Sequence, residues 1–163
     1  MSGKESEAAV EIEVETEDWL AVLPQVEAEA RTAAEAALVA AGRGGGVVIL
    51  LTDDAAVAEL NRQFRGKTGP TNVLSFPAAA NPVDHLGDVA LAFGVCQAEA
   101  EAQGKRLADH LQHLVAHGVL HLVGFDHQTD QEAQAMEGLE RRILQGLGVP
   151  DPYGAEEDPA DVG

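Results

Sequence analysis

The stretch Gly46-Val-Val-Ile-Leu-Leu51, together with the Thr52-Asp53 pair that follows it, decides how this chain folds. The run is apolar throughout, which is the pattern of a strand covered on both faces rather than on one. Thr52 or Asp53 can cap the start of a helix that reaches about Phe64, and Gly66 can end it. We therefore expect a central strand followed directly by a helix.

The residues before this strand predict an edge strand and a helical region. The segment Val10-Glu-Ile-Glu-Val14 alternates apolar and acidic residues, which is typical of a half-exposed strand. Residues from about 17 to 41 are rich in Ala and Glu and indicate helix, with Pro24 either starting a new helix or kinking this one. The glycines from Gly42 to Gly46 lack the GK[ST] ending of a phosphate loop and form a connector.

The residues after the central strand complete the predicted architecture. Two short strands, Val73–Phe76 and Asp88–Ala92, flank a loop that contains Pro82. Helices are expected over about 95–103, 105–123 and 129–147, the last one begun by Thr129 or Asp130. The order β, α, β, α, β, β, α, α, α predicts an α/β (α+β) fold with a mixed sheet of about four strands and about five helices.

The length and composition favour one domain over residues 1–163. We expect its core over about 8–150 and a flexible acidic end over 151–163. Only 4% of the residues are aromatic, so Leu, Val and Ala must supply most of the packing. The formal net charge of −18 argues against a general nucleic-acid binder, although much of the acid lies near the two ends.

Cysteine and hydropathy patterns bear on the compartment. Cys96 is the one cysteine, so the chain can form no intrachain disulfide and a cysteine-based zinc site would lack ligands. The first residues show no cationic segment followed by an apolar run, and no stretch approaches the ~20 apolar residues of a membrane span. We expect a cytoplasmic protein without a membrane partner.

Three histidines have the spacing of metal ligands. His117 and His121 stand four residues apart on a predicted helix, so their rings project from one face. Gly124 allows the chain to leave that helix through a positive φ and to return His127 toward the same face. Three imidazoles without cysteine predict one catalytic zinc ion per chain, because a fourth tetrahedral position stays open.

Neighbouring residues leave several roles open. His113, like His110, precedes the motif at helical spacing and either contacts a ligand or the substrate or simply packs. Asp126 either accepts a hydrogen bond from a ligand imidazole or caps the turn. The same spacing occurs in metzincin proteases, where a glutamate base follows the first ligand, whereas Gly118 stands at that place here. A peptidase would therefore lack its base unless Asp126 replaced it.

The sequence around the histidines resembles a known family. His117-Gly-Val-Leu-His121-Leu-Val-Gly124-Phe-Asp-His127 is similar to the signature of the YbeY family of bacterial endoribonucleases. Further similar segments follow the family order: Leu60-Asn61, Phe64-Arg65-Gly66-Lys67, Pro70-Thr-Asn-Val-Leu-Ser-Phe-Pro77 and Leu86-Gly-Asp-Val89. The resemblance covers roughly Val47 to Tyr153. Three residues depart from the family pattern: Phe64 and Phe125 stand where many members have Tyr, and Asn72 stands where many have Asp. None of these departures is at one of the three histidine positions.

The resemblance implies a zinc-dependent, single-strand-specific endoribonuclease that acts in rRNA processing, notably at the 3′ end of small-subunit rRNA, and in ribosome quality control. RNA, the small ribosomal subunit and assembly factors are the implied partners. The three histidines would hold the zinc ion, and Arg65 would have a catalytic, substrate-binding role. The guanidinium of Arg65 suits a phosphate, and Lys67 adds a positive charge for RNA binding.

Other readings remain at this point. One is a metallopeptidase-like hydrolase, which Gly118 disfavours. Another is a non-catalytic, zinc-containing ribosome assembly factor, in which the metal only stabilises the fold. For RNA cleavage, either a metal-bound water or the 2′-hydroxyl of the RNA would attack phosphorus.

Overall fold

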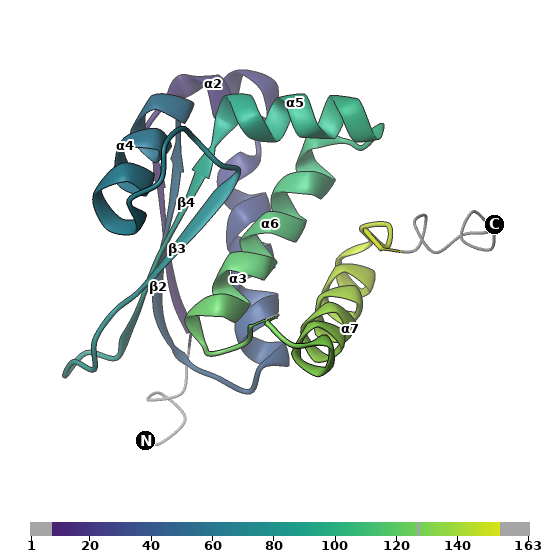
Figure 1. The fold of residues 1–163 in the computed structure, drawn as a ribbon. Helices are drawn as coiled ribbons and strands as arrows, with labels where there is room; N and C mark the ends of the chain where they lie inside the picture. The colour runs from purple at the N-terminus through teal and green to yellow at the C-terminus, as the bar shows by residue number, and fades with distance from the viewer. Residues whose placement is uncertain (1–7, 127, 154–163) are drawn as a thin grey trace.

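The computed structural model describes residues 8–126 and 128–153 and arranges them as a mixed sheet with helices on both faces (Figure 1). The elements are β1 (Ala8–Val14), α2 (Glu17–Val22), α3 (Val26–Ala40), β2 (Gly45–Thr52), α4 (Asp54–Arg65), β3 (Val73–Pro77), β4 (His85–Ala92), α5 (Phe93–Gln103), α6 (Leu107–Leu122) and α7 (Asp130–Leu147). The strand order is β1-β2-β4-β3; β1, β2 and β4 are parallel, and β3 is antiparallel to β4. The predicted α/β fold with a four-stranded mixed sheet is confirmed, with β1 at an edge.

The two faces of the sheet are covered unequally. Val47, Ile49 and Leu51 of β2 are at most 1% exposed and face the larger core, to which α3, α6 and α7 contribute. Val48 and Leu50 point to the opposite face and stay partly exposed. Figure 1 shows α4 on that face, while α3 and α6 lie on the other. Both faces of β2 are therefore packed against helices, as its apolar run predicts, although α4 leaves Val48 and Leu50 partly exposed.

The helix boundaries settle two alternatives that the sequence left open. α2 ends at Val22 and α3 begins at Val26, so Pro24 separates two helices and the described chain has six helices instead of about five. Proline ends the first helix because it has no N–H for the helical ladder. The N-cap of α4 is Asp53, whose Oδ1 accepts a hydrogen bond of 2.8 Å from the backbone N–H of Ala56.

The last strand starts earlier than the sequence predicts. β4 begins at His85 rather than Asp88, because His85 pairs with Gly46 across a register shift in β2. Asn81 supports this start: its side chain accepts from the backbone N–H of His85 and donates to the His85 carbonyl. Pairing with β2 thus extends a segment whose own residues give little strand signal.

α6 carries two of the predicted metal ligands and approaches the sheet closely at Gly118. A Cβ atom at Gly118 would lie 2.7 Å from Cγ1 of Val89 and 3.2 Å from Oγ of Ser75. The Ser75 hydroxyl also donates a hydrogen bond of 2.9 Å to the Gly118 carbonyl. This contact fixes the height of α6 above β3 and β4, and with it the position of His117.

Replacing Gly118 by alanine should lower the free energy of unfolding by about 1–3 kcal/mol, because the added methyl group overpacks the contact with β4. Gly138 in α7 is the matched control, since a Cβ there meets nothing within 4 Å. Gly138→Ala should instead raise stability, by about 0.5–1 kcal/mol. Urea unfolding of both variants, with a metal chelator present, measures the difference. Equal free energies of unfolding would show that the contact between α6 and β4 has room for a methyl group.

Residues 151–153, which are the described part of the acidic end expected to be flexible, contact α7. Pro152 is buried, and Arg141 of α7 approaches both the Asp151 carboxylate, at 3.3 Å, and the Tyr153 ring. Residues 154–163 lie outside the described residues. Among the described helices, none combines the length and hydropathy that crossing a membrane requires.

Candidate metal centre

Two of the three predicted ligands lie side by side. The ring centroids of His117 and His121 are 4.7 Å apart, and both side chains are half-buried. They line a cavity of about 400 Å³ between α6, β3 and the end of α4. The other residues of this cavity are Arg65, Asn72, Val73, Ser75, Pro77 and Asp126. His127 lies outside the described residues, so the structure does not place the third predicted ligand.

The buried carboxylate of Glu140, which is not among the predicted site residues, forms a hydrogen bond with His117. Glu140 of α7 is 0% exposed and accepts hydrogen bonds from Nδ1 of His117 at 2.7 Å and from Nε2 of His113 at 2.9 Å. The hydroxyl of Tyr153 donates a third, at 2.6 Å. Burial raises the pKa of Glu140, but these three hydrogen bonds outweigh it and lower the pKa to about 2.

The ionised state of Glu140 determines which nitrogen of His117 can bind a metal. A carboxylate accepts only, so Nδ1 of His117 must carry its proton and donate it. In the neutral ring, Nε2 then keeps a lone pair. A carboxylate bonded to one ring nitrogen is the usual partner of a metal-ligating histidine, because it fixes the tautomer and the ring orientation.

Glu140 also belongs to a group with ligand atoms of its own. His113, His117 and Glu140 each offer one ligand atom, and these atoms lie within 4.8 Å of one another, so this group could hold a metal ion. The distances from Glu140 are 2.7 and 2.9 Å, which are hydrogen-bond lengths. Two ligands of one tetrahedral zinc would stand about 3.3 Å apart. The geometry therefore favours hydrogen bonding here and a metal on the other side of His117.

The three residues that the sequence placed near the predicted ligands, Asp126, His113 and His110, lie in different surroundings in the structure. Asp126 lines the cavity. His113 does not line it; it shares the Glu140 carboxylate with His117, and its ring packs edge-to-face against the rings of His117, at 6.3 Å, and Tyr153, at 5.7 Å. His110 belongs to another pair, in which Nε2 contacts Oε1 of Glu99 at 2.9 Å, and burial lowers the pKa of His110.

Of the basic residues Arg62, Arg65 and Lys67, only Arg65 lines the cavity. Arg65 is the last residue of α4, because Gly66 takes a left-handed conformation with φ 66° and ends the helix. The exposed Arg65 lines the cavity with both histidines. Lys67 is exposed and is not among the lining residues, and Arg62 forms an ion pair with Glu59 on the helix surface. Among the residues that the structure describes, Arg65 is therefore the cation that lines this cavity.

The packing of Gly118 bears on the peptidase alternative. The residue after His117 faces the sheet, where even a Cβ would lie 2.7 Å from Val89. A glutamate at this place would clash with Val89 and crowd the Ser75 hydroxyl unless α6 moved away from the sheet. Gly118 has no side chain that could act as a base, so the metzincin motif lacks its base here.

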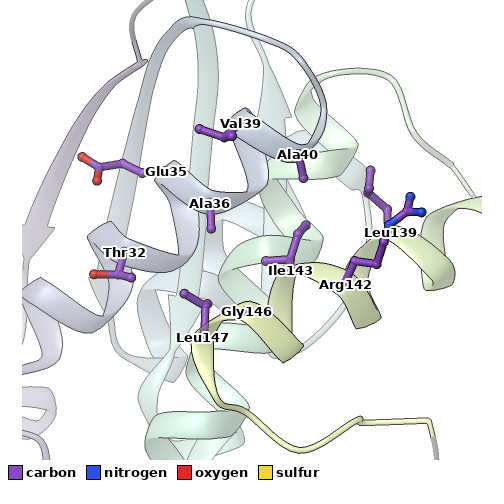
Figure 2. Close-up of a pocket in the computed structure, with 10 residues that line it drawn as sticks. All are labelled: Thr32, Glu35, Ala36, Val39, Ala40, Leu139, Arg142, Ile143, Gly146 and Leu147. Carbon is purple, nitrogen blue, oxygen red and sulfur yellow. The ribbon is translucent and has the colours of Figure 1, made fainter.

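A larger open groove elsewhere lacks ligand chemistry. Figure 2 shows its lining side chains on α3 and α7, and its volume is about 630 Å³. Its charged lining residues are Glu35 and Arg142, and no described histidine contributes to it. The cavity beside His117 and His121 is therefore the better candidate for a catalytic centre.

Comparison with known proteins finds one family by sequence and a similar fold among solved structures. A family model described as Endoribonuclease YbeY matches residues 5–148. A protein from Maricaulis maris named Endoribonuclease YbeY is 62% identical over 106 residues, which are 65% of this chain and 66% of that relative. A relative of the same name from Azorhizobium caulinodans is 49% identical over 152 residues, 88% of this chain and 95% of its own length. The solution structure of TM1509 from Thermotoga maritima shares the fold, with a TM-score of 0.57 and 22% identity over 93% of this chain and 95% of that chain.

Proposed function

Since this chain belongs to the YbeY family, whose model matches residues 5–148, we propose that it is a zinc-dependent endoribonuclease that cleaves single-stranded RNA in ribosomal RNA processing. The proposed substrate region is the 3′ end of small-subunit rRNA, and a role in ribosome quality control follows from the same family. The small subunit and its assembly factors are the proposed partners, and the cytoplasm is the proposed compartment.

The meeting of two histidines and an arginine in one cavity supports this proposal most directly. His117 and His121 would hold the metal together with His127, and Arg65 faces the same cavity from α4. A planar guanidinium binds a phosphate through two parallel hydrogen bonds, which a lysine cannot reproduce. The cavity thus joins a metal-ligand pair to a phosphate-binding group.

In the proposed reaction, the histidines would bind the metal ion and Arg65 would bind the phosphate. When bound, a zinc ion supplies Lewis-acid polarisation of a phosphoryl oxygen. Neutral imidazoles suit zinc, and Glu140 keeps the proton of His117 on Nδ1, so that Nε2 is available as a ligand. Arg65 would bind the phosphate and stabilise the charge that develops on its oxygens.

An assay with purified full-length protein separates this function from the other two readings. Zinc-loaded protein, with and without chelator, is offered single-stranded rRNA fragments, duplex RNA of the same sequence and an unfolded protein. We expect chelator-sensitive cuts in the single-stranded RNA alone. Cuts in the unfolded protein would support a peptidase, and intact substrates with a lower melting temperature after chelation would support a structural zinc ion.

A further inference from the structure

A second cavity lies beside the candidate metal centre, on the opposite face of β3. Its volume is about 700 Å³, within the usual range of small-ligand sites. Arg65, Ser75 and Pro77 line both cavities. β3 is an edge strand, so an extended chain that crosses its free edge at Arg65 would contact one cavity after the other.

An exposed aromatic ring forms one wall of this second cavity. Phe64 is 65% exposed, and it is the aromatic member of the five exposed large hydrophobic side chains in the described part of the chain. Its ring stands edge-to-face with Phe76, at 5.3 Å between centroids and an angle of 63°. Phe76 is partly buried against the sheet, so it supports Phe64 while leaving most of that ring in solvent.

The remaining lining combines apolar walls with one polar pair. Leu50 and Leu60 supply apolar surface, and Nε2 of His85 contacts Oδ1 of Asp88 at 2.9 Å in the wall. The Asp88 carboxylate would repel a phosphate, whereas a flat group with a polar rim fits both the apolar walls and the pair. A nucleobase has this chemistry, with a π face for stacking and donors and acceptors along its edge.

We propose that the cavity of Phe64, Phe76 and the His85–Asp88 pair binds the base of a nucleotide next to the cleaved phosphate. This inference rests on the proposed endoribonuclease function. Arg65 holds the phosphate at the boundary between the two cavities, and the base stacks on Phe64. Stacking tolerates many sequences but requires an unpaired base, so the cavity selects single-stranded RNA over duplex.

Abasic scanning of RNA tests this subsite apart from catalysis. The affinity of zinc-loaded protein is measured by anisotropy on one single-stranded RNA, in which each nucleotide in turn lacks its base. We expect one position next to the cut to lose roughly tenfold in affinity. Phe64→Ala should weaken binding of the intact RNA by a similar factor and remove the effect of that abasic position, while Phe64→Trp should retain both.

Val39→Ala is the matched control, because Val39 is also an exposed apolar side chain but lines the groove between α3 and α7 (Figure 2). It should leave the abasic profile unchanged. A flat profile for the wild-type protein, or a profile that survives in Phe64→Ala, would overturn the proposed subsite even if RNA is cut. A base-dependent profile that Phe64→Ala removes, without any cleavage, would sustain base binding in this cavity and contradict the proposed enzyme.

Discussion

Replacing Arg65 by alanine should lower the single-turnover rate of RNA cleavage by roughly 100- to 1,000-fold, the range seen when one preorganised donor to a transition-state oxyanion is removed. Arg65 lies at the exposed end of α4 and lines the cavity of His117 and His121. Zinc content and the free energy of unfolding should stay near their wild-type values. Cleavage at the wild-type rate would remove Arg65 from the mechanism.

Two further variants show whether position or charge matters at Arg65. Arg62→Ala makes the same change in net charge on the same helix, but Arg62 is paired with Glu59 and does not line the cavity. It should cleave at close to the wild-type rate. Arg65→Lys should recover RNA affinity better than rate, because a point charge attracts the backbone but does not reproduce the bidentate contact. Equal losses in Arg62→Ala and Arg65→Ala would indicate a general charge effect.

Replacing Glu140 by glutamine should weaken zinc binding by about 10- to 100-fold, although Glu140 is not itself an expected ligand. An amide offers one accepting oxygen where the carboxylate offers two, so it cannot hold both His113 and His117. Glu140→Ala should in addition lower the free energy of unfolding by roughly 3–5 kcal/mol, since the donors on His113, His117 and Tyr153 lose their acceptor at about 1–3 kcal/mol each. Competition with a chromophoric chelator measures the affinity, and urea unfolding measures the stability.

Two controls separate the contact to His117 from general effects on α7. Glu137→Gln makes the same charge change one turn earlier, and Tyr153→Phe removes one of the three hydrogen bonds to Glu140 without touching His117. Glu137→Gln should retain the wild-type zinc affinity. Tyr153→Phe should lose stability, by about 1.5–3 kcal/mol, but little affinity. If Glu140→Gln binds zinc as tightly as Glu137→Gln, Glu140 does not position the ligand.

The fold was largely predictable because periodicity and helix boundaries are local signals. The buried run of β2, the alternation in β1 and the glycine that ends α4 all act within a few residues. The start of β4 was not predictable in this way, because His85 becomes part of a strand only through its pairing with β2.

The site was predictable only in part, for the same reason. The four-residue spacing of His117 and His121 brings their rings together on one helix. Glu140 was missed, yet α7 carried a signal: Met136, Leu139, Ile143 and Leu144 form its buried stripe, and Glu140 falls on that stripe. A carboxylate on an apolar stripe needs partners, so it marks a candidate contact to the histidines. The hydrogen bond from Tyr153 depends on tertiary packing alone.

The central claim is that one metal ion on the three histidines is required for the reaction. The most direct test is to add zinc stepwise to metal-free protein and to measure the single-turnover rate at which single-stranded RNA is cleaved. The rate should rise linearly and stop rising at one zinc ion per chain. The variant with alanine at His117, His121 and His127 should bind no stoichiometric zinc and show no rise. Full cleavage by metal-free protein, or the same titration curve in the triple variant, would contradict the proposed metal centre.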